Sequence, residues 1–316
     1  MTSRTSPDGS LAVVAPAPSF SSLVQIDVAA LSHTGYHREN NEDHFFVTKL
    51  TRTLQTLTTS LPAGSVPDRA DEVNYVMVVA DGMGGHAAGE VASRMAISAL
   101  VSLALDIPDW IFKVDAEHAR ELEERSRTRV QEIGALLVEQ GERDPALRGM
   151  GTTLTGARSL GRDLMITHVG DSRAYLLRGE GLHHLTRDHT YAQLLVDLGQ
   201  LAPGDVATSR HRHVLMNALG AGSHATVQVD TDHLQLEDGD RVLLCSDGLT
   251  DLIDDATITG ILLAATRSED ACERLVQRAL DGGGRDNVTV IVAAYRFPEG
   301  SAHAMDDAGN DADTRA

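Results

Sequence analysis

Short apolar and β-branched runs recur along most of this chain, and several are separated by no more than a tight turn. The tetrapeptide RGEG at 178–181, for example, separates the run RAYLLR from the next apolar segment. Antiparallel strands can be joined by such short turns, whereas parallel strands need long crossover connections. The pattern therefore favours antiparallel sheets over a doubly wound parallel sheet.

Helical patterns come in pairs between groups of strand-like runs. The first pair is expected over 90–105 and 115–141, and the second over 255–265 and 268–280. In the longest of these segments Val130, Ile133 and Leu137 fall on one face, as in a helix that packs on a sheet. This order predicts an α+β domain in which helices cover the outer faces of antiparallel sheets.

The two ends of the chain differ in composition from the rest. Residues 1–22 are rich in Ser, Pro and Ala, and 298–316 are acidic with few residues that could anchor them, so both are predicted to be disordered tails. One domain is expected over 23–297. Two segments interrupt its strand pattern: a polar loop at 51–73 and a flap at 191–219 with small helices of its own.

The overall charge restricts the possible partners. The formal net charge is -19, from 46 acidic and 27 basic residues, which opposes binding to nucleic acid or to an anionic membrane. An acidic excess suits divalent cations, but it also serves solubility alone.

Two cysteines are too few for a disulfide framework, no run approaches the roughly 20 apolar residues of a membrane span, and LAVVAPAP at 11–18 is a poor signal peptide. These features predict a cytoplasmic protein.

Carboxylates stand at the ends of the strand-like runs. Three runs end with a carboxylate, at Asp81, Asp171 and Asp247. Two others begin with one, at Asp286 and at the pair Glu42 and Asp43. In antiparallel sheets the end of one strand lies beside the start of its neighbour, so these groups can meet at one edge. Crowded carboxylates repel one another unless hard cations such as Mg²⁺ or Mn²⁺ neutralise them. Any one of these aspartates alone would be interpreted as a turn or cap residue.

The loop VADGMGGHAAGEVAS at 79–93 has two interpretations. Gly82 can bring its carbonyl close to a cation while Gly84 and Gly85 shape the turn. Alternatively, the spacing G-x-G-x-x-A between a strand and a helix suits a dinucleotide. The negative charge of Asp81 and the antiparallel pattern both oppose the dinucleotide site.

Taken together, the motifs resemble the PPM-type, or type 2C, metal-dependent serine/threonine protein phosphatases in their bacterial form. The matching motifs, in order, are GYHRENNEDH, VVADGMGGHAAGEVAS, GMGTTLT, HVGDSRAYLLR, LTRDHT, NALG, LLCSDGLTD and GGGRDNVTVIV. The resemblance covers about residues 25 to 297. It implies a four-layer α-β-β-α sandwich with two central antiparallel sheets and a catalytic domain over 23–297.

The resemblance also implies a metal site with two tightly bound Mn²⁺ or Mg²⁺ ions and a third, weaker one. Each implied ligand is a residue of a matching motif. Asp81 would bridge both ions, the Gly82 carbonyl, Asp247 and Asp286 would bind directly, Glu42 and Asp43 would hold waters, and Asp171, Asp251 and Asp247 would form the third site. Arg38 is similar to the arginine that grips the substrate phosphate.

The implied reaction is hydrolysis of phosphoserine and phosphothreonine in proteins by a metal-activated water, opposing serine/threonine kinases. The implied partners are phosphorylated proteins, the implied state is a monomer, and neither cysteine is needed. One position departs from some members, which have a histidine after the Asp-Gly pair as proton donor: here it is Met83, with His86 three residues later. The alternative is a catalytically silent, phosphoprotein-binding domain of the same fold, disfavoured because Asp81, Asp247 and Asp286 are all present.

Four other features take simpler interpretations. His168, inside an apolar run, is expected to be a hydrogen-bonded core residue, and RHRH at 210–213 to be a solvated part of the flap. Ser172 lacks an apparent Asp-His relay, so it is not expected to be a nucleophile. Arg173 beside Asp171 is interpreted as a structural ion pair.

Overall fold

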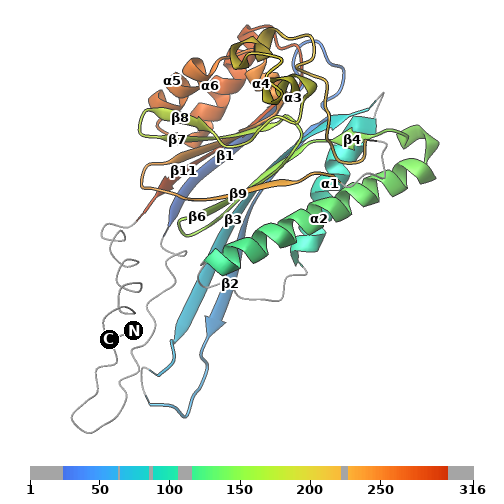
Figure 1. The fold of residues 1–316 in the computed structure, drawn as a ribbon. Helices are drawn as coiled ribbons and strands as arrows, with labels where there is room; N and C mark the ends of the chain where they lie inside the picture. Colours follow the sequence, from blue (N-terminus) through green and yellow to red (C-terminus); the bar gives the residue numbers. More distant parts are fainter. Residues whose placement is uncertain (1–23, 63–64, 85–87, 106–115, 222–226, 298–316) are drawn as a thin grey trace, which may run out of the picture.

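Two antiparallel sheets, packed face to face, form the centre of the protein in the computed structural model (Figure 1). The structure describes residues 24–62, 65–84, 88–105, 116–221 and 227–297. The first sheet has the order β1 (Gln25–His33), β11 (Val288–Arg296), β10 (Arg241–Cys245), β7 (Arg173–Arg178) and β8 (Gly181–His184). The second has the order β2 (Asp43–Gln55), β3 (Arg69–Met83), β5 (Leu154–Leu160), β6 (Asp163–Val169) and β9 (Asp230–Gln235), with the short β4 (Gly151–Thr152) paired to β3.

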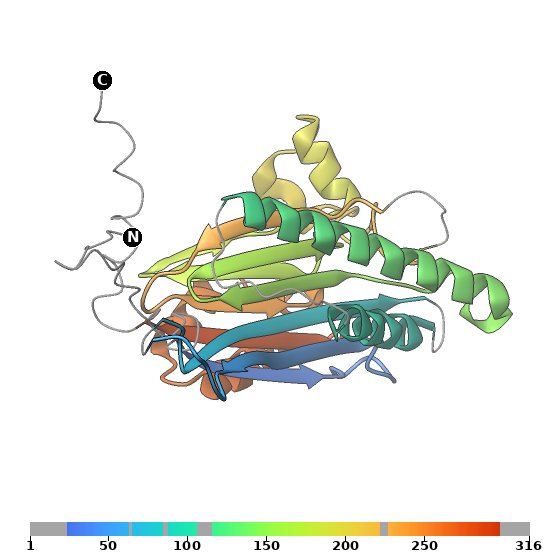
Figure 2. The same ribbon diagram turned by 90° about the horizontal axis from the view of Figure 1, so that it is seen from below.

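Helices cover the outer faces of both sheets. In Figure 1, α1 (Ala88–Leu105) and α2 (Ala116–Arg143) lie on one side, and α5 (Asp255–Ala264) and α6 (Ser268–Asp281) lie on the other. Figure 2 shows α2 running along its sheet as one long helix. The short elements are η2 (Pro145–Leu147), α3 (Tyr191–Asp197), η3 (Pro203–Thr208) and α4 (Asp247–Thr250). This arrangement confirms the predicted four-layer α-β-β-α sandwich.

Three apolar clusters hold the four layers together. The middle cluster lies between the sheets and includes Leu164, Leu244 and Ile291. The cluster beneath α1 and α2 contains the predicted helix face, Val130, Ile133 and Leu137, all buried. A third lies beneath α5 and α6. Burial of one face of each helix and both inner sheet faces is the main favourable term in folding such a layered domain.

The segment 51–73 was predicted to be a polar loop, and this prediction is wrong at both of its ends. β2 continues to Gln55 and β3 begins at Arg69, so only the residues between them form a loop. Figure 1 shows the far ends of β2 and β3 extending as a ribbon beyond the helices. Both faces of a projecting ribbon can meet water, so its sequence lacks the alternation that marks a half-buried strand.

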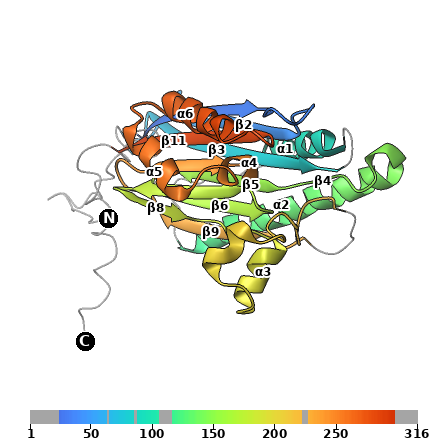
Figure 3. The ribbon, with the colours of Figure 1, turned by 90° about the horizontal axis from the view of Figure 1, so that it is seen from above.

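The flap at 191–219 does contain small helices, as predicted. α3 and η3 project from the body of the domain in Figures 2 and 3, where they are yellow. The predicted tails, 1–22 and 298–316, lie outside the described residues, and the domain limits stay predictions. Within the described chain, none of the helices combines the length and the apolar character needed to cross a membrane.

Candidate metal centre

Eight of the nine predicted site residues line one cavity of about 710 Å³. They are Arg38, Glu42, Asp81, Gly82, Asp171, Asp247, Asp251 and Asp286. The ninth, Asp43, is buried behind the cavity wall. The cavity lies where the two sheets end together: Asp81 is near the end of β3, Asp247 follows β10, and Asp286 precedes β11. Strand ends from both sheets therefore bring these carboxylates together, as the sequence predicted.

The centre of the site is a pair of opposed carboxylates. Asp43 and Asp81 are directly opposite each other in the register of β2 and β3. Burial, followed by repulsion from Asp43, Asp247, Asp171 and Asp286, raises the pKa of Asp81 well above its usual range. Burial likewise raises the pKa of Asp43 to about 7, although a hydrogen bond from Ser246 Oγ, 2.7 Å from Oδ2, favours its ionised form. Without a counter-charge, these two groups resist being ionised together.

The residues present fit divalent cations. The Oδ1 atom of Asp43 is buried and has no hydrogen-bond partner among the described residues. Buried polar atoms nearly always have a partner, and an orphaned carboxylate oxygen beside a second carboxylate suits a bound cation or its water. The donors around this point are oxygens, which Mg²⁺ and Mn²⁺ prefer to nitrogen or sulfur.

A network of hydrogen bonds fixes the loops that carry the remaining acidic groups. Asn287 donates from Nδ2 to the carbonyls of Thr34 and Asn40, 2.8 and 3.0 Å away, and its Oδ1 accepts from the backbone N–H of Glu42 at 2.8 Å. Its own backbone N–H donates to Asp286 Oδ1 at 2.8 Å. Asn287 therefore holds the loop before β2 against the loop before β11, so Glu42 and Asp286 face one cavity.

Arg38 comes from the same loop as Glu42. Its Nη2 atom donates to Asp286 Oδ2 at 2.6 Å, and this hydrogen bond raises the pKa of Arg38. About half of the Arg38 side chain is exposed to solvent at the cavity. The guanidinium is thus held at the cavity by one contact while other N–H donors remain available for an anion.

Glycine is required at two positions beside the carboxylates. A Cβ on Gly82 would lie 2.2 Å from the Gly89 carbonyl oxygen and 2.7 Å from that of Glu42. A Cβ on Gly248 would lie 2.0 Å from the Asn287 carbonyl oxygen. Any side chain here would push apart the loops that the network holds together.

The flap contributes two residues that the sequence analysis did not assign to the site. His213 lies 3.7 Å from Asp247 Oδ2, through Nδ1, and 3.4 Å from Asp251 Oδ2, through Nε2. Arg212 Nε lies 3.6 Å from Asp251 Oδ1. Both side chains are partly exposed, as expected for a solvated segment, but both also line the cavity. The motif RHRH was the available signal, but no spacing in the sequence links it to Asp251.

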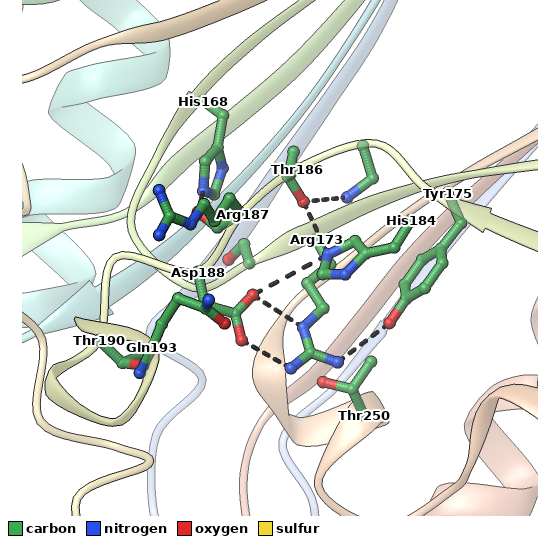
Figure 4. A network of polar contacts seen from close by, with 12 residues as sticks. His168, Arg173, Tyr175, His184, Thr186, Arg187, Asp188, Thr190, Gln193 and Thr250 are labelled. Carbon is green, nitrogen blue, oxygen red and sulfur yellow. Dashed lines mark hydrogen bonds and ion pairs between the residues drawn. The ribbon is translucent and has the colours of Figure 1, made fainter. Parts of the chain in front are cut away.

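An ion pair at the base of the flap also differs from the prediction. Arg173 does not pair with Asp171 but with Asp188, through two hydrogen bonds of 2.9 and 2.6 Å (Figure 4). It also donates to the Tyr175 hydroxyl at 3.1 Å. Asp188 lies two residues before Thr190, which caps the start of α3. The pair therefore joins β7, just after Asp171, to the first turn of the flap.

The other assignments agree with their simpler interpretations. His168 is buried, shares hydrogen bonds with Thr155 and with the Arg187 carbonyl, and burial lowers its pKa to about 4. Ser172 is buried and shares a 2.8 Å hydrogen bond with Thr153. Met83 lines the cavity and carries no proton to donate, and His86 lies outside the described residues.

Comparison with known proteins finds similarity to a family of phosphatases. The model of the family Protein phosphatase 2C matches residues 67–282. The serine/threonine protein phosphatase PstP of Mycobacterium tuberculosis is 39% identical over 267 residues, which cover 84% of this chain but 44% of that relative. The chain thus spans less than half the length of this relative. The serine/threonine phosphatase stp of Listeria welshimeri is 35% identical over 217 residues, 69% of this chain and 83% of the relative.

Solved structures agree with the sequence relatives. The structure of the PstP catalytic domain in complex with 2 manganese ions has a TM-score of 0.67 and 36% identity, and covers 86% of this chain and 99% of that one. The structure of the Mycobacterium tuberculosis phosphatase PstP/Ppp has a TM-score of 0.69 and 37% identity, with coverage of 86% and 99%. The fold is therefore shared over nearly all of the described residues.

Proposed function

The chain belongs to the protein phosphatase 2C family, and from this premise we propose that it hydrolyses phosphoserine and phosphothreonine in proteins. The observation that carries the proposal is the single cavity lined by six carboxylate residues together with the half-exposed Arg38. Such a cavity repels a phosphate unless cations are bound in it, and it then attracts one.

We assign the binding roles as follows. Asp81, the Gly82 carbonyl, Asp247 and Asp286 hold two Mn²⁺ or Mg²⁺ ions, and Glu42 and Asp43 orient the water around them. Asp171, Asp251 and Asp247 hold a third ion. The orphaned Asp43 Oδ1 and the opposed pair Asp43 and Asp81 support the assignment, because both call for positive charge at this point.

The bound cations would supply Lewis acidity toward the attacking water and the phosphoryl oxygens. Arg38 adds N–H donors for the phosphoryl oxygens, and its 2.6 Å contact with Asp286 sets the position from which it donates. The opposed carboxylates favour binding of the cations, because two buried negative charges are neutralised at once. A proton for the leaving serine or threonine oxygen comes from water, since Met83 has none to give.

The physiological setting completes the proposal. Phosphorylated serine/threonine kinases and the proteins they modify are the proposed substrates, met in the cytoplasm by a monomer of this chain. The two cysteines, both free and buried, support a reducing compartment. A silent phosphoprotein-binding domain is disfavoured, because such a domain has no need of a complete set of carboxylates around one cavity.

The test is hydrolysis of a phosphothreonine peptide with Mn²⁺. Activity should disappear with EDTA, return with Mn²⁺, and fall by at least about 10³-fold in Asp81→Asn, because the central ligand is lost. The matched control is Asp281→Asn, whose carboxylate accepts a hydrogen bond from Gln277 on the exposed side of α6. Activity that persists in Asp81→Asn or in EDTA would contradict the proposed function.

A further inference from the structure

His213 lies between two carboxylates at the mouth of the cavity. Among the described residues, ligand atoms of His213, Asp247 and Asp251 all lie within 4.8 Å of one another. The individual contacts are 3.7 Å to Asp247 and 3.4 Å to Asp251. His213 is the only member of this group that comes from the flap, and half of its side chain is exposed.

A fourth group points to a ligand at the same place. Asp171 is only 7% exposed, yet it lines the same cavity as His213, Asp247 and Asp251. Three carboxylates therefore face one imidazole and the Arg212 guanidinium, which leaves buried negative charge unbalanced.

The separations suit a single six-coordinate ion. Ligand atoms at about 2.1 Å from an octahedral cation lie about 3.0 Å apart when adjacent and about 4.2 Å apart when opposite. An imidazole binds a given ion through one nitrogen, and with one ligand atom taken from each residue, His213, Asp247 and Asp251 lie within 4.8 Å of one another, close to this range.

We infer that His213 supplies a nitrogen ligand from the flap to the cation held by Asp171, Asp247 and Asp251. The inference rests on the proposed function, since it concerns the third ion of that site, but the resemblance implied oxygen ligands alone. Two consequences follow. A nitrogen ligand shifts preference from Mg²⁺ toward Mn²⁺, and a bound ion ties the flap to α4, which carries Asp247.

The test is pulsed electron paramagnetic resonance on the full chain, stripped with EDTA and reloaded with three equivalents of Mn²⁺. The expected result is hyperfine coupling to one imidazole ¹⁴N, which disappears in His213→Asn. His211→Asn is the matched control, because His211 lies two residues away on the flap and contacts Arg210 and Tyr191 instead of the carboxylates. It should leave the coupling unchanged.

A Mn²⁺ titration gives the second readout. The weakest equivalent should bind at least about tenfold less tightly in His213→Asn, while Mg²⁺ affinity changes less. Absence of ¹⁴N coupling in the wild type, or its persistence in His213→Asn, overturns the inference. If two tight equivalents still bind in that case, the proposed function stands, whereas a chain that binds no Mn²⁺ at all overturns both. Circular dichroism checks that the variant is folded.

Discussion

Asp43 and Asp81 lie directly opposite each other across β2 and β3, so two neighbouring strands bring a carboxylate to the same buried point. Directly opposed like charges destabilise a sheet. The sheet holds this pair because packing on both sides fixes the register, and a bound cation removes the conflict. The stability of the domain is therefore linked to both pH and metal.

The first prediction is that the metal-free protein loses stability as pH rises toward neutrality. The pKa of Asp43 in the folded state is about 7, above its ordinary value of 3.8, so folding favours the protonated form. That contribution is complete below about pH 3.8 and is lost as pH rises through about 7, with a slope of up to about 1.4 kcal/mol per pH unit.

Urea unfolding between pH 5.5 and 8 in EDTA measures this loss. Asp43→Asn should show a smaller decline than the wild type, because its side chain stays neutral throughout. Saturating Mn²⁺ should also flatten the wild-type profile. Equal slopes for the two proteins in EDTA would contradict the prediction.

The second prediction concerns Gly82. Alanine there forces its Cβ toward the Gly89 and Glu42 carbonyls, and we expect a loss of about 1–3 kcal/mol in the free energy of unfolding, together with weaker Mn²⁺ binding. Gly260→Ala is the control, since Gly260 lies in α5 with no atom close to a new Cβ. That variant should gain up to about 1 kcal/mol from helix propensity. Chemical denaturation measures the free energy of unfolding of both variants. An unchanged value for Gly82→Ala would contradict the packing argument.

The third prediction concerns the ion pair between Arg173 and Asp188. Removing one partner leaves a largely buried charge, so Arg173→Met and Asp188→Leu should each cost about 3–5 kcal/mol. The double variant should recover much of that loss, because no lone charge remains. A double-mutant cycle by urea unfolding measures the coupling. Strictly additive losses would show that the pair does not act as a unit.

The fourth prediction concerns Arg38. Arg38→Lys keeps the positive charge but loses the planar fork of donors, and we expect kcat/KM for a phosphopeptide to fall by about 10²-fold with Mn²⁺ binding retained. Arg267→Lys, at an exposed residue before α6, is the control. Steady-state kinetics at saturating Mn²⁺ test this. An unchanged kcat/KM would remove Arg38 from substrate binding.

Much of the architecture was predictable, because the end of a strand can be recognised from a few neighbouring residues. Asp81, Asp247 and Asp286 each stand beside an apolar run, and antiparallel pairing then brings such ends together. The ends of β2 and β3 were missed, since a projecting ribbon leaves no buried face to impose alternation. The position of His213 was missed for a different reason: only the path of the flap brings it to Asp251. Similarly, Arg173 pairs with Asp188 rather than with its near neighbour Asp171, because the chain that leads into the flap returns to the end of β7.

The strand order of the first sheet also has a consequence for synthesis on the ribosome. β1 pairs with β11, which lies between β1 and β10, and Asp286 is two residues before β11. After β1 has been synthesised, it therefore cannot pair until β11 has been synthesised, on the order of ten seconds or more later at typical translation rates. During that time Asp286 has not yet been synthesised, and the sheet that positions Asp247 lacks β11. Under the proposed function, a nascent or truncated chain that stops before β11 should therefore be inactive, because its metal site is incomplete until the whole domain has been made.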